Sequence, residues 1–145
     1  MSALPVLVVG AGPTGLTLAC ELARHGVACR VVEKAPRLFI GSRAKGLQPR
    51  SLEVLEDLGV LPAIFAGGAP FPPFRLYAGE ELRWEKTLEE MLGQPPSPPS
   101  PQVPYPRAWL IPQWRTDRIL AERFAELSGD ERAVKGRLAC RRSRA

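Results

Sequence analysis

The sequence is poor in the residues that build metal sites, disulfide frameworks and hydrolytic triads. It has three cysteines, none in Cys-x-x-Cys spacing, and a single histidine, His25. An odd number of cysteines without paired spacing argues against a disulfide framework and against a zinc site. His25 falls near the end of a predicted helix, where the helix dipole favours a cation, so it is not assigned to a Ser-His-Asp triad. We therefore predict no metal site and no Ser-His-Asp triad in this chain.

Long apolar runs are also missing. No run approaches the roughly 18 residues that a membrane-spanning helix needs. The first ten residues, MSALPVLVVG, lack the basic segment that opens a secretory signal. These absences predict a cytoplasmic protein without membrane contact.

Basic charge is concentrated in one place, at residues 130–145. This stretch holds six of the 20 lysines and arginines and two of the 15 acids, which leaves 14 basic and 13 acidic residues elsewhere. No aromatic residue is interleaved with these charges, so no base-stacking platform is present. We therefore do not predict nucleic-acid binding.

The first thirty-three residues follow a strand, glycine turn, helix and strand pattern. The apolar run Leu4–Val9 predicts a strand buried on both faces, as in a parallel sheet. Residues 10–15 (GAGPTG) follow at once, and apolar residues at helical spacing predict a helix that ends at Gly26. A second apolar run, residues 28–32, closes on Glu33. The pattern predicts an α/β fold with a Rossmann-like βαβ unit.

Each part of this pattern has a physical role in dinucleotide binding. Gly10 permits the tight turn, Gly12 lets the backbone approach a diphosphate, and Gly15 lets the helix lie close to the strand. The helix N-terminus presents free N–H groups to the phosphates. Glu33 lies 18 residues after Gly15, where a carboxylate accepts hydrogen bonds from ribose hydroxyls and repels a 2′-phosphate. The unit is therefore predicted to bind FAD or NAD in preference to NADP.

The rest of the chain favours a flavoprotein over a simple NAD-binding half-domain. A polar loop leads to a helix that Pro49 opens and Gly59 ends, and alternation over residues 74–85 predicts an antiparallel β-hairpin. Such a hairpin fits an FAD domain interrupted by other sheet elements. Residues 95–106 contain seven prolines, which predicts a stiff polyproline II connection, with a ligand for SH3-like modules as the alternative.

Three stretches carry a family resemblance. They are VLVVGAGPTGLTLACELARHGVACRVVEK, SRAKGLQPRSLEVLEDLGV and YPRAWLIPQWRTDRILAERFAEL, and they span most of residues 4–127. In this order they resemble the N-terminal part of the FAD-dependent aromatic hydroxylases, the para-hydroxybenzoate hydroxylase-like monooxygenases. The similarity is greatest to the branch that acts on polyketides, phenols and rifamycin-type antibiotics.

The resemblance implies a cofactor, a co-substrate and a set of site residues. The cofactor would be FAD, with NAD(P)H as co-substrate in the full-length family and an aromatic or polyketide-like small molecule as substrate. Arg43 would lie against the phosphate–ribitol region of the flavin, and Gln113 would contact FAD from the start of a helix. The implied cofactor site comprises Gly10, Gly12, Pro13, Thr14, Gly15, Glu33, Lys34, Arg43 and Gln113.

The resemblance also sets the expected domain boundaries. Residues 1–128 would form the N-terminal portion of an FAD-binding domain, with residues 94–106 as a proline-rich connection and residues 129–145 as a basic tail. Family members are longer and carry a second FAD motif and a substrate-binding sheet, which this sequence lacks. We therefore expect a chain that is truncated relative to the family and not catalytically complete alone. An NAD-binding Rossmann oxidoreductase module and a non-enzymatic fragment remain the alternatives.

Overall fold

The computed structural model describes residues 6–41, 43, 46–93 and 97–129. The predicted basic tail beyond Gly129 and the first residues of the proline-rich connection lie outside these ranges. The chain divides into two compact units, one of residues 1–44 and 112–145 and one of residues 45–111. The expectation that residues 1–128 are a portion of one domain stays a prediction.

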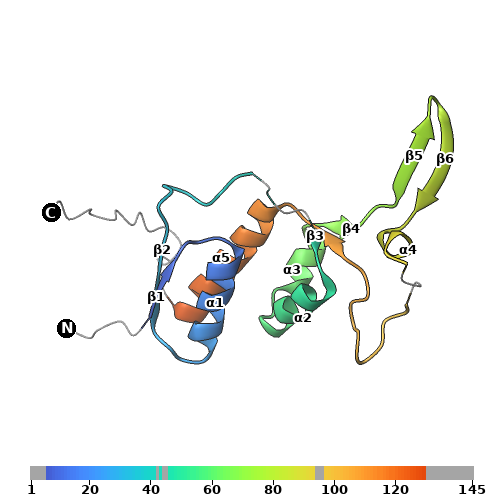
Figure 1. The fold of residues 1–145 in the computed structure, drawn as a ribbon. Coiled ribbons are helices and arrows are strands. Elements are labelled where there is room, and N and C mark those ends of the chain that lie inside the picture. Colours follow the sequence, from blue (N-terminus) through green and yellow to red (C-terminus); the bar gives the residue numbers. More distant parts are fainter. Residues whose placement is uncertain (1–5, 42, 44–45, 94–96, 130–145) are drawn as a thin grey trace, which may run out of the picture. The chain divides into compact units, whose positions relative to one another are not determined.

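The first unit contains the predicted βαβ motif. Strand β1 (Val6–Val9) leads into helix α1 (Pro13–Arg24), and strand β2 (Cys29–Val32) follows. The two strands pair in parallel, with Val6 opposite Cys29 and Val9 opposite Val32. Gly26, with φ +71°, supplies the left-handed residue that ends the helical turn. The predicted strand–helix–strand order is confirmed (Figure 1).

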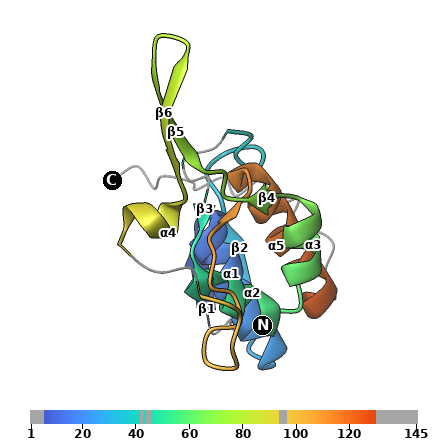
Figure 2. The same cartoon turned by 90° about the vertical axis from the view of Figure 1, so that its right-hand side faces the viewer.

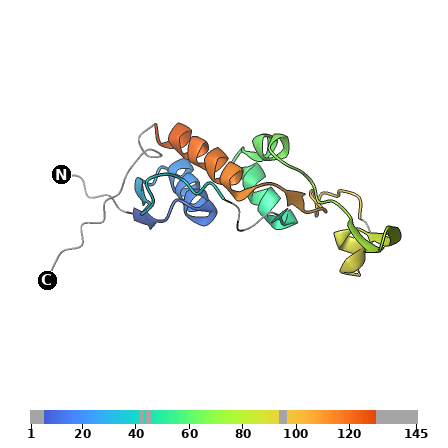
Figure 3. The ribbon, with the colours of Figure 1, turned by 90° about the horizontal axis from the view of Figure 1, so that it is seen from above.

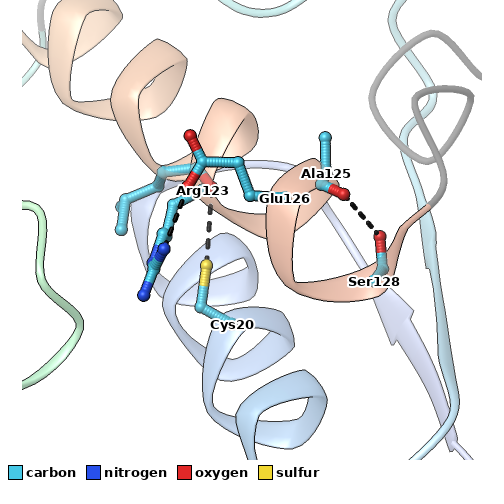
Figure 4. A network of polar contacts seen from close by, with 6 residues as sticks. Cys20, Arg123, Ala125, Glu126 and Ser128 are labelled. Carbon is cyan, nitrogen blue, oxygen red and sulfur yellow. Dashed lines mark hydrogen bonds and ion pairs between the residues drawn. The ribbon is translucent and has the colours of Figure 1, made fainter.

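Helix α5 (Gln113–Ser128) completes this unit by packing beside α1 (Figures 1 and 3). Small residues let the two helices approach, since Ala19 and Ala121 are fully buried. The Cys20 thiol donates to the Leu120 carbonyl oxygen at 3.4 Å (Figure 4), and burial raises the pKa of this thiol to about 11. The unit's buried apolar residues are Val8, Leu16, Ala19, Cys20, Leu120, Ala121 and Phe124.

The C-terminal turn of α5 is held by contacts within the helix. Arg123 donates to Glu126 at 2.9 Å, and the Ser128 hydroxyl donates to the Ala125 carbonyl oxygen at 3.4 Å (Figure 4). Gly129 then adopts φ +66°, the left-handed conformation that terminates a helix. This glycine is therefore the C-cap of α5.

The expectation that the first strand is buried on both faces is wrong for this chain. Val8 is only 5% exposed, whereas Leu7 is 61% and Val9 is 79% exposed. The physical reason is that α1 packs against one face of the two-stranded sheet, and no described element covers the side chains of Leu7 and Val9.

Apart from a hairpin and a short helix described below, the second unit consists of two helices and three very short strands. Helix α2 (Pro49–Asp57) is followed by α3 (Leu61–Ala66), and Gly59 with φ +74° makes the turn between them. Strands β3 (Gly46–Leu47), β7 (Trp109–Leu110) and β4 (Ala69–Pro70) form an antiparallel sheet in the order β3-β7-β4. The core residues are Leu52, Leu55, Leu58, Val60, Leu61, Ile64, Ala108 and Ile111.

The predicted hairpin is confirmed (Figure 2). Strand β5 (Phe74–Ala78) pairs antiparallel with β6 (Glu81–Lys86), and Gly79 takes φ +64° in the connecting turn. An ion pair between Arg75 and Glu85 joins directly opposed residues. Short helix α4 (Leu88–Met91) follows, opened by a capping box in which Thr87 and Glu90 exchange hydrogen bonds.

The proline-rich stretch is not one continuous extended connection. Residues 101 and 102 form a turn, and Ser100 and Val103 exchange two backbone hydrogen bonds of 3.0 Å across it. The turn closes because Ser100 and Val103 keep the N–H groups that proline lacks. Beyond it the chain returns to the aromatic cluster of Phe65, Tyr105 and Trp109, beside a pocket of about 560 Å³.

No helix in the part of the chain that the structure describes is both long enough and apolar enough to span a membrane.

Candidate cofactor-binding site

The glycine turn joins the end of β1 to the start of α1. Gly10 adopts φ +107° and donates its N–H to the Val32 carbonyl oxygen at 2.6 Å, which ties the turn to β2. A Cβ added at Gly15 would lie 2.0 Å from the Gly10 carbonyl oxygen and 3.4 Å from Val8. Only glycine therefore lets α1 approach the strand this closely, as the sequence predicts.

The mouth of this turn is open. Nothing lies within 4 Å of a Cβ built on Gly12, although its φ of −86° and ψ of −178° suit any residue. The missing side chain at Gly12 thus leaves free space above the backbone, and the local fold does not need that space. A diphosphate approaching the turn would occupy such a space.

The N-terminus of α1 faces the same turn with free donors. Gly12 is the N-cap, Pro13 takes the first helical position, and no described side chain caps the helix. The first intrahelical bond from this end is donated by Leu16 to the Gly12 carbonyl oxygen at 2.9 Å. The N–H groups of Thr14 and Gly15 precede it and have no intrahelical acceptor. Together with the helix dipole they favour an anion at this end of α1.

Glu33 lies beside the turn at the end of β2. Its Oε2 accepts from the Ala11 N–H at 2.8 Å and its Oε1 accepts from the Ala35 N–H at 3.0 Å. These backbone hydrogen bonds, the one from Ala11 first, lower the pKa of Glu33 below its usual value, so the side chain is ionised at neutral pH. A carboxylate has about four acceptor positions. Glu33 can therefore hold the turn and still accept hydrogen bonds from a ribose.

Two predicted residues that are seventy positions apart meet at the start of α5. The backbone N–H of Arg43 donates to Gln113 Oε1 at 3.2 Å. The Arg43 guanidinium lies over the ring of Phe39, 4.5 Å from its centroid. The structure thus brings Arg43 and Gln113 together. Their contacts with FAD stay a prediction, and the exposed Lys34 contributes no described contact to this pair.

The sequence prediction missed one polar residue of this site, Asp117. Its side chain is fully buried, and its Oδ2 accepts from Gln113 Nε2 at 3.4 Å. Burial raises the pKa of Asp117 to about 6, against the opposing effects of the Gln113 hydrogen bond and the Arg43 charge. The sequence does contain a pattern that singles out Asp117. Asp117 is four residues after Gln113 and shares the helical face of Leu120 and Phe124, where an apolar residue is expected.

Comparisons with known proteins find a matching family and related sequences. The model of the FAD-binding domain family matches residues 3–136. A flavin-dependent monooxygenase of Mycobacteroides abscessus is 59% identical over 127 residues, which are 88% of this chain and 26% of that protein. A 6-methylpretetramide 4-monooxygenase of Streptomyces rimosus is 37% identical over 124 residues, 84% of this chain and 20% of that protein.

A solved structure shows the same relationship. The crystal structure of p-nitrophenol 4-monooxygenase PnpA from Pseudomonas putida superimposes with a TM-score of 0.66 at 26% identity, covering 84% of this chain and 29% of that one. In each comparison the chain spans only about a fifth to a third of the length of the protein it matches.

Proposed function

The chain belongs to the FAD-binding domain family, and we propose that its glycine turn, Glu33, Arg43 and Gln113 hold the nucleotide and diphosphate part of FAD. The observation that carries the proposal is the contrast between two glycines. A Cβ at Gly15 would collide with backbone, whereas a Cβ at Gly12 would meet open space. The first glycine is needed for the fold, whereas the space at the second lies open beside the free amides of α1, where a diphosphate can enter.

The chemistry of the other groups supports the same ligand. The first-turn amides of α1 suit the diphosphate, and the ionised Glu33 suits a ribose with free hydroxyls. Because Glu33 carries a negative charge, a 2′-phosphate at this position would be repelled, which disfavours NADP. Pro13, Thr14 and Lys34 flank these groups and belong to the proposed contact set.

The whole protein is proposed to be a flavin-dependent monooxygenase. Bound FAD would supply the redox chemistry that inserts oxygen, with a reduced nicotinamide as electron donor. The substrate would be an aromatic or polyketide-like small molecule, since the relatives compared above are named for p-nitrophenol and 6-methylpretetramide. The residues of this chain would bind and orient the cofactor, and none is assigned a proton-transfer step.

The test is FAD binding by the purified chain and by Gly12→Val. The wild-type chain should take up FAD in a titration followed by flavin fluorescence, whereas Gly12→Val should lose binding because its side chain fills the space for the diphosphate. Thermal unfolding of Gly12→Val should match the wild type, since φ and ψ at Gly12 are allowed for valine.

Gly46→Ala serves as the control variant, because a Cβ there makes only ordinary contact, 3.6 Å from Phe71, in the other unit. It should bind FAD like the wild type. Undiminished FAD affinity in Gly12→Val would refute the placement of the diphosphate. Saturable binding of NAD without uptake of FAD would support the NAD-binding alternative instead.

A further inference from the structure

The side chain of Gln113 connects a backbone amide to a buried acid. Its Oε1 accepts from the Arg43 N–H at 3.2 Å, and its Nε2 donates to the carboxylate of Asp117 at 3.4 Å. A backbone N–H can only donate, and an ionised carboxylate can only accept. The two partners therefore permit one orientation of the Gln113 amide and oppose the flipped one.

The buried carboxylate of Asp117 lowers the stability of the folded chain. It is fully buried, and its Oδ1 has no hydrogen-bond partner in the described part of the chain. A buried carboxylate with an unpaired oxygen costs free energy that an apolar side chain of similar size would not. The pKa of Asp117 is raised to about 6 for the same reason, since burial disfavours the ionised carboxylate. Packing alone therefore does not explain an acid at this position.

We propose that Asp117 is a positioning residue of the FAD site, whose buried carboxylate fixes the Gln113 amide so that Gln113 holds the backbone of Arg43 at the start of α5. The inference rests on the proposed function, in which Arg43 and Gln113 contact FAD. It adds that these two residues are arranged before the cofactor arrives, and that a residue acting through Gln113 arranges them.

The arrangement has a built-in pH dependence. Apart from Gln113, the described group that acts on the charge of Asp117 is Arg43, and α1, which packs on α5, brings no charged side chain that shifts the Asp117 pKa. Below a pH of about 6 the carboxyl becomes protonated. The charge-assisted hydrogen bond from Gln113 is then replaced by a weaker neutral one, and of the two partners that fix the amide only the Arg43 N–H still opposes a flip.

The first experiment needs no FAD. In NMR spectra of the cofactor-free chain, the Arg43 backbone amide and the Gln113 side-chain amide should shift together with a midpoint near pH 6. The shift should be absent in Asp117→Asn and Asp117→Leu. It should persist in Thr116→Val, which changes the neighbouring buried polar residue of the same helix.

The second experiment measures FAD affinity at pH values of about 5 and about 7.5 on either side of this midpoint. Wild-type affinity should fall by about tenfold at the lower pH, and Asp117→Leu should bind about tenfold more weakly at the higher pH, with no pH effect from this group. The FAD affinity of Asp117→Asn should lie between those of the wild type at the higher pH and of Asp117→Leu, because its amide oxygen still accepts from Gln113. Its affinity should not depend on pH through this group.

The stability of Asp117→Leu separates positioning from a merely structural role. Its thermal unfolding temperature at the higher pH should be no lower than that of the wild type, since the variant removes a buried unpaired oxygen. Weaker FAD binding by an undamaged fold supports the proposal. Equal FAD affinity and an unshifted Arg43 amide in Asp117→Leu would overturn it. If the wild type binds no FAD, the proposed function falls, while the cofactor-free NMR titration still decides whether Asp117 orders Gln113.

Discussion

At the scale of single residues, some residues of the candidate site are needed for the fold, and others are available for a ligand. The missing side chain of Gly15 serves the fold, because its hydrogen atom faces the Gly10 carbonyl oxygen with no room for carbon. Glu33 holds the glycine turn through Ala11, and it is also the residue that we propose to bind the ribose. Gly12 is left with no role in the fold, which is why it is the position to change when binding is tested.

Glu33→Gln should lower the stability of the cofactor-free chain at neutral pH by about 1 kcal/mol, because glutamine has a single, neutral oxygen to accept from the Ala11 and Ala35 amides, and its NH2 group cannot accept. The native pKa of Glu33 lies below the ordinary value of 4.5. Its stabilising contribution is therefore complete above 4.5 and disappears as the pH falls through the lowered native pKa. Chemical denaturation at several pH values measures the difference.

Glu122→Gln is the matched control for this charge change. Glu122 is 65% exposed and pairs with Arg118 at 3.3 Å along one face of α5, so its loss should change stability by a few tenths of a kcal/mol. A destabilisation of Glu33→Gln that stayed constant down to strongly acidic pH would contradict the assignment of a stabilising charge to Glu33.

At the scale of elements, the helices, strands and turns that depend on residues close together in the sequence could be predicted. The glycine turn, α1, β2, α2 and the β5–β6 hairpin were all predicted, because periodicity and turn residues determine them locally. The two-residue strands β3, β4 and β7 are too short to show alternation, and they pair residues that are far apart in the sequence, such as Gly46 with Leu110 and Ala69 with Leu110. The turn at residues 101–102 was missed because prolines dominate the composition around it.

The exposure of β1 was predicted wrongly for a related reason. An apolar run shows that a strand is suited to burial, but whether both faces are covered depends on elements distant in the sequence. The candidate site shows the same division. Its glycines and Glu33 follow from local spacing, and so does the contact of Gln113 with Asp117 one helical turn later, whereas the contact of Arg43 with Gln113 depends on where α5 docks.

Two neighbouring valines of β1 test this one-sided burial. Val8→Thr should destabilise the chain by about 1–3 kcal/mol, because it places a hydroxyl in the core. Val9→Thr should change stability by less than about 0.5 kcal/mol, because that side chain is 79% exposed. Urea unfolding of the two variants side by side gives the answer, and equal destabilisation would show that both faces of β1 are covered in solution.

At the scale of the whole molecule, the chain exposes apolar side chains in both units. Leu7 and Val9 are exposed in the first unit, and Leu76, Tyr77 and Leu82 are about half exposed on the β5–β6 hairpin of the second. Hairpin strands also present unpaired backbone groups along their outer edges. Such surfaces favour association between copies when protein concentration rises.

Leu76→Lys should therefore weaken concentration-dependent self-association, measured by sedimentation velocity over a dilution series. Val103→Lys introduces the same charge at an apolar side chain of similar exposure, 42% against 49%, outside the hairpin. It should leave association unchanged if the hairpin is the surface involved. An equal effect of the two variants would show that net charge, and not the hairpin face, governs association.

The Cys20 thiol, which is buried between α1 and α5, can report on local opening of the first unit. Cys20 is inaccessible and protonated while the helices are together, so an alkylating reagent can reach it only when α5 lifts away. Cys29, which is partly accessible, provides an internal reference for reagent reactivity. The labelling rate of Cys20 thus reports how often the two helices separate. A ligand that binds at the start of α5 would lower this rate.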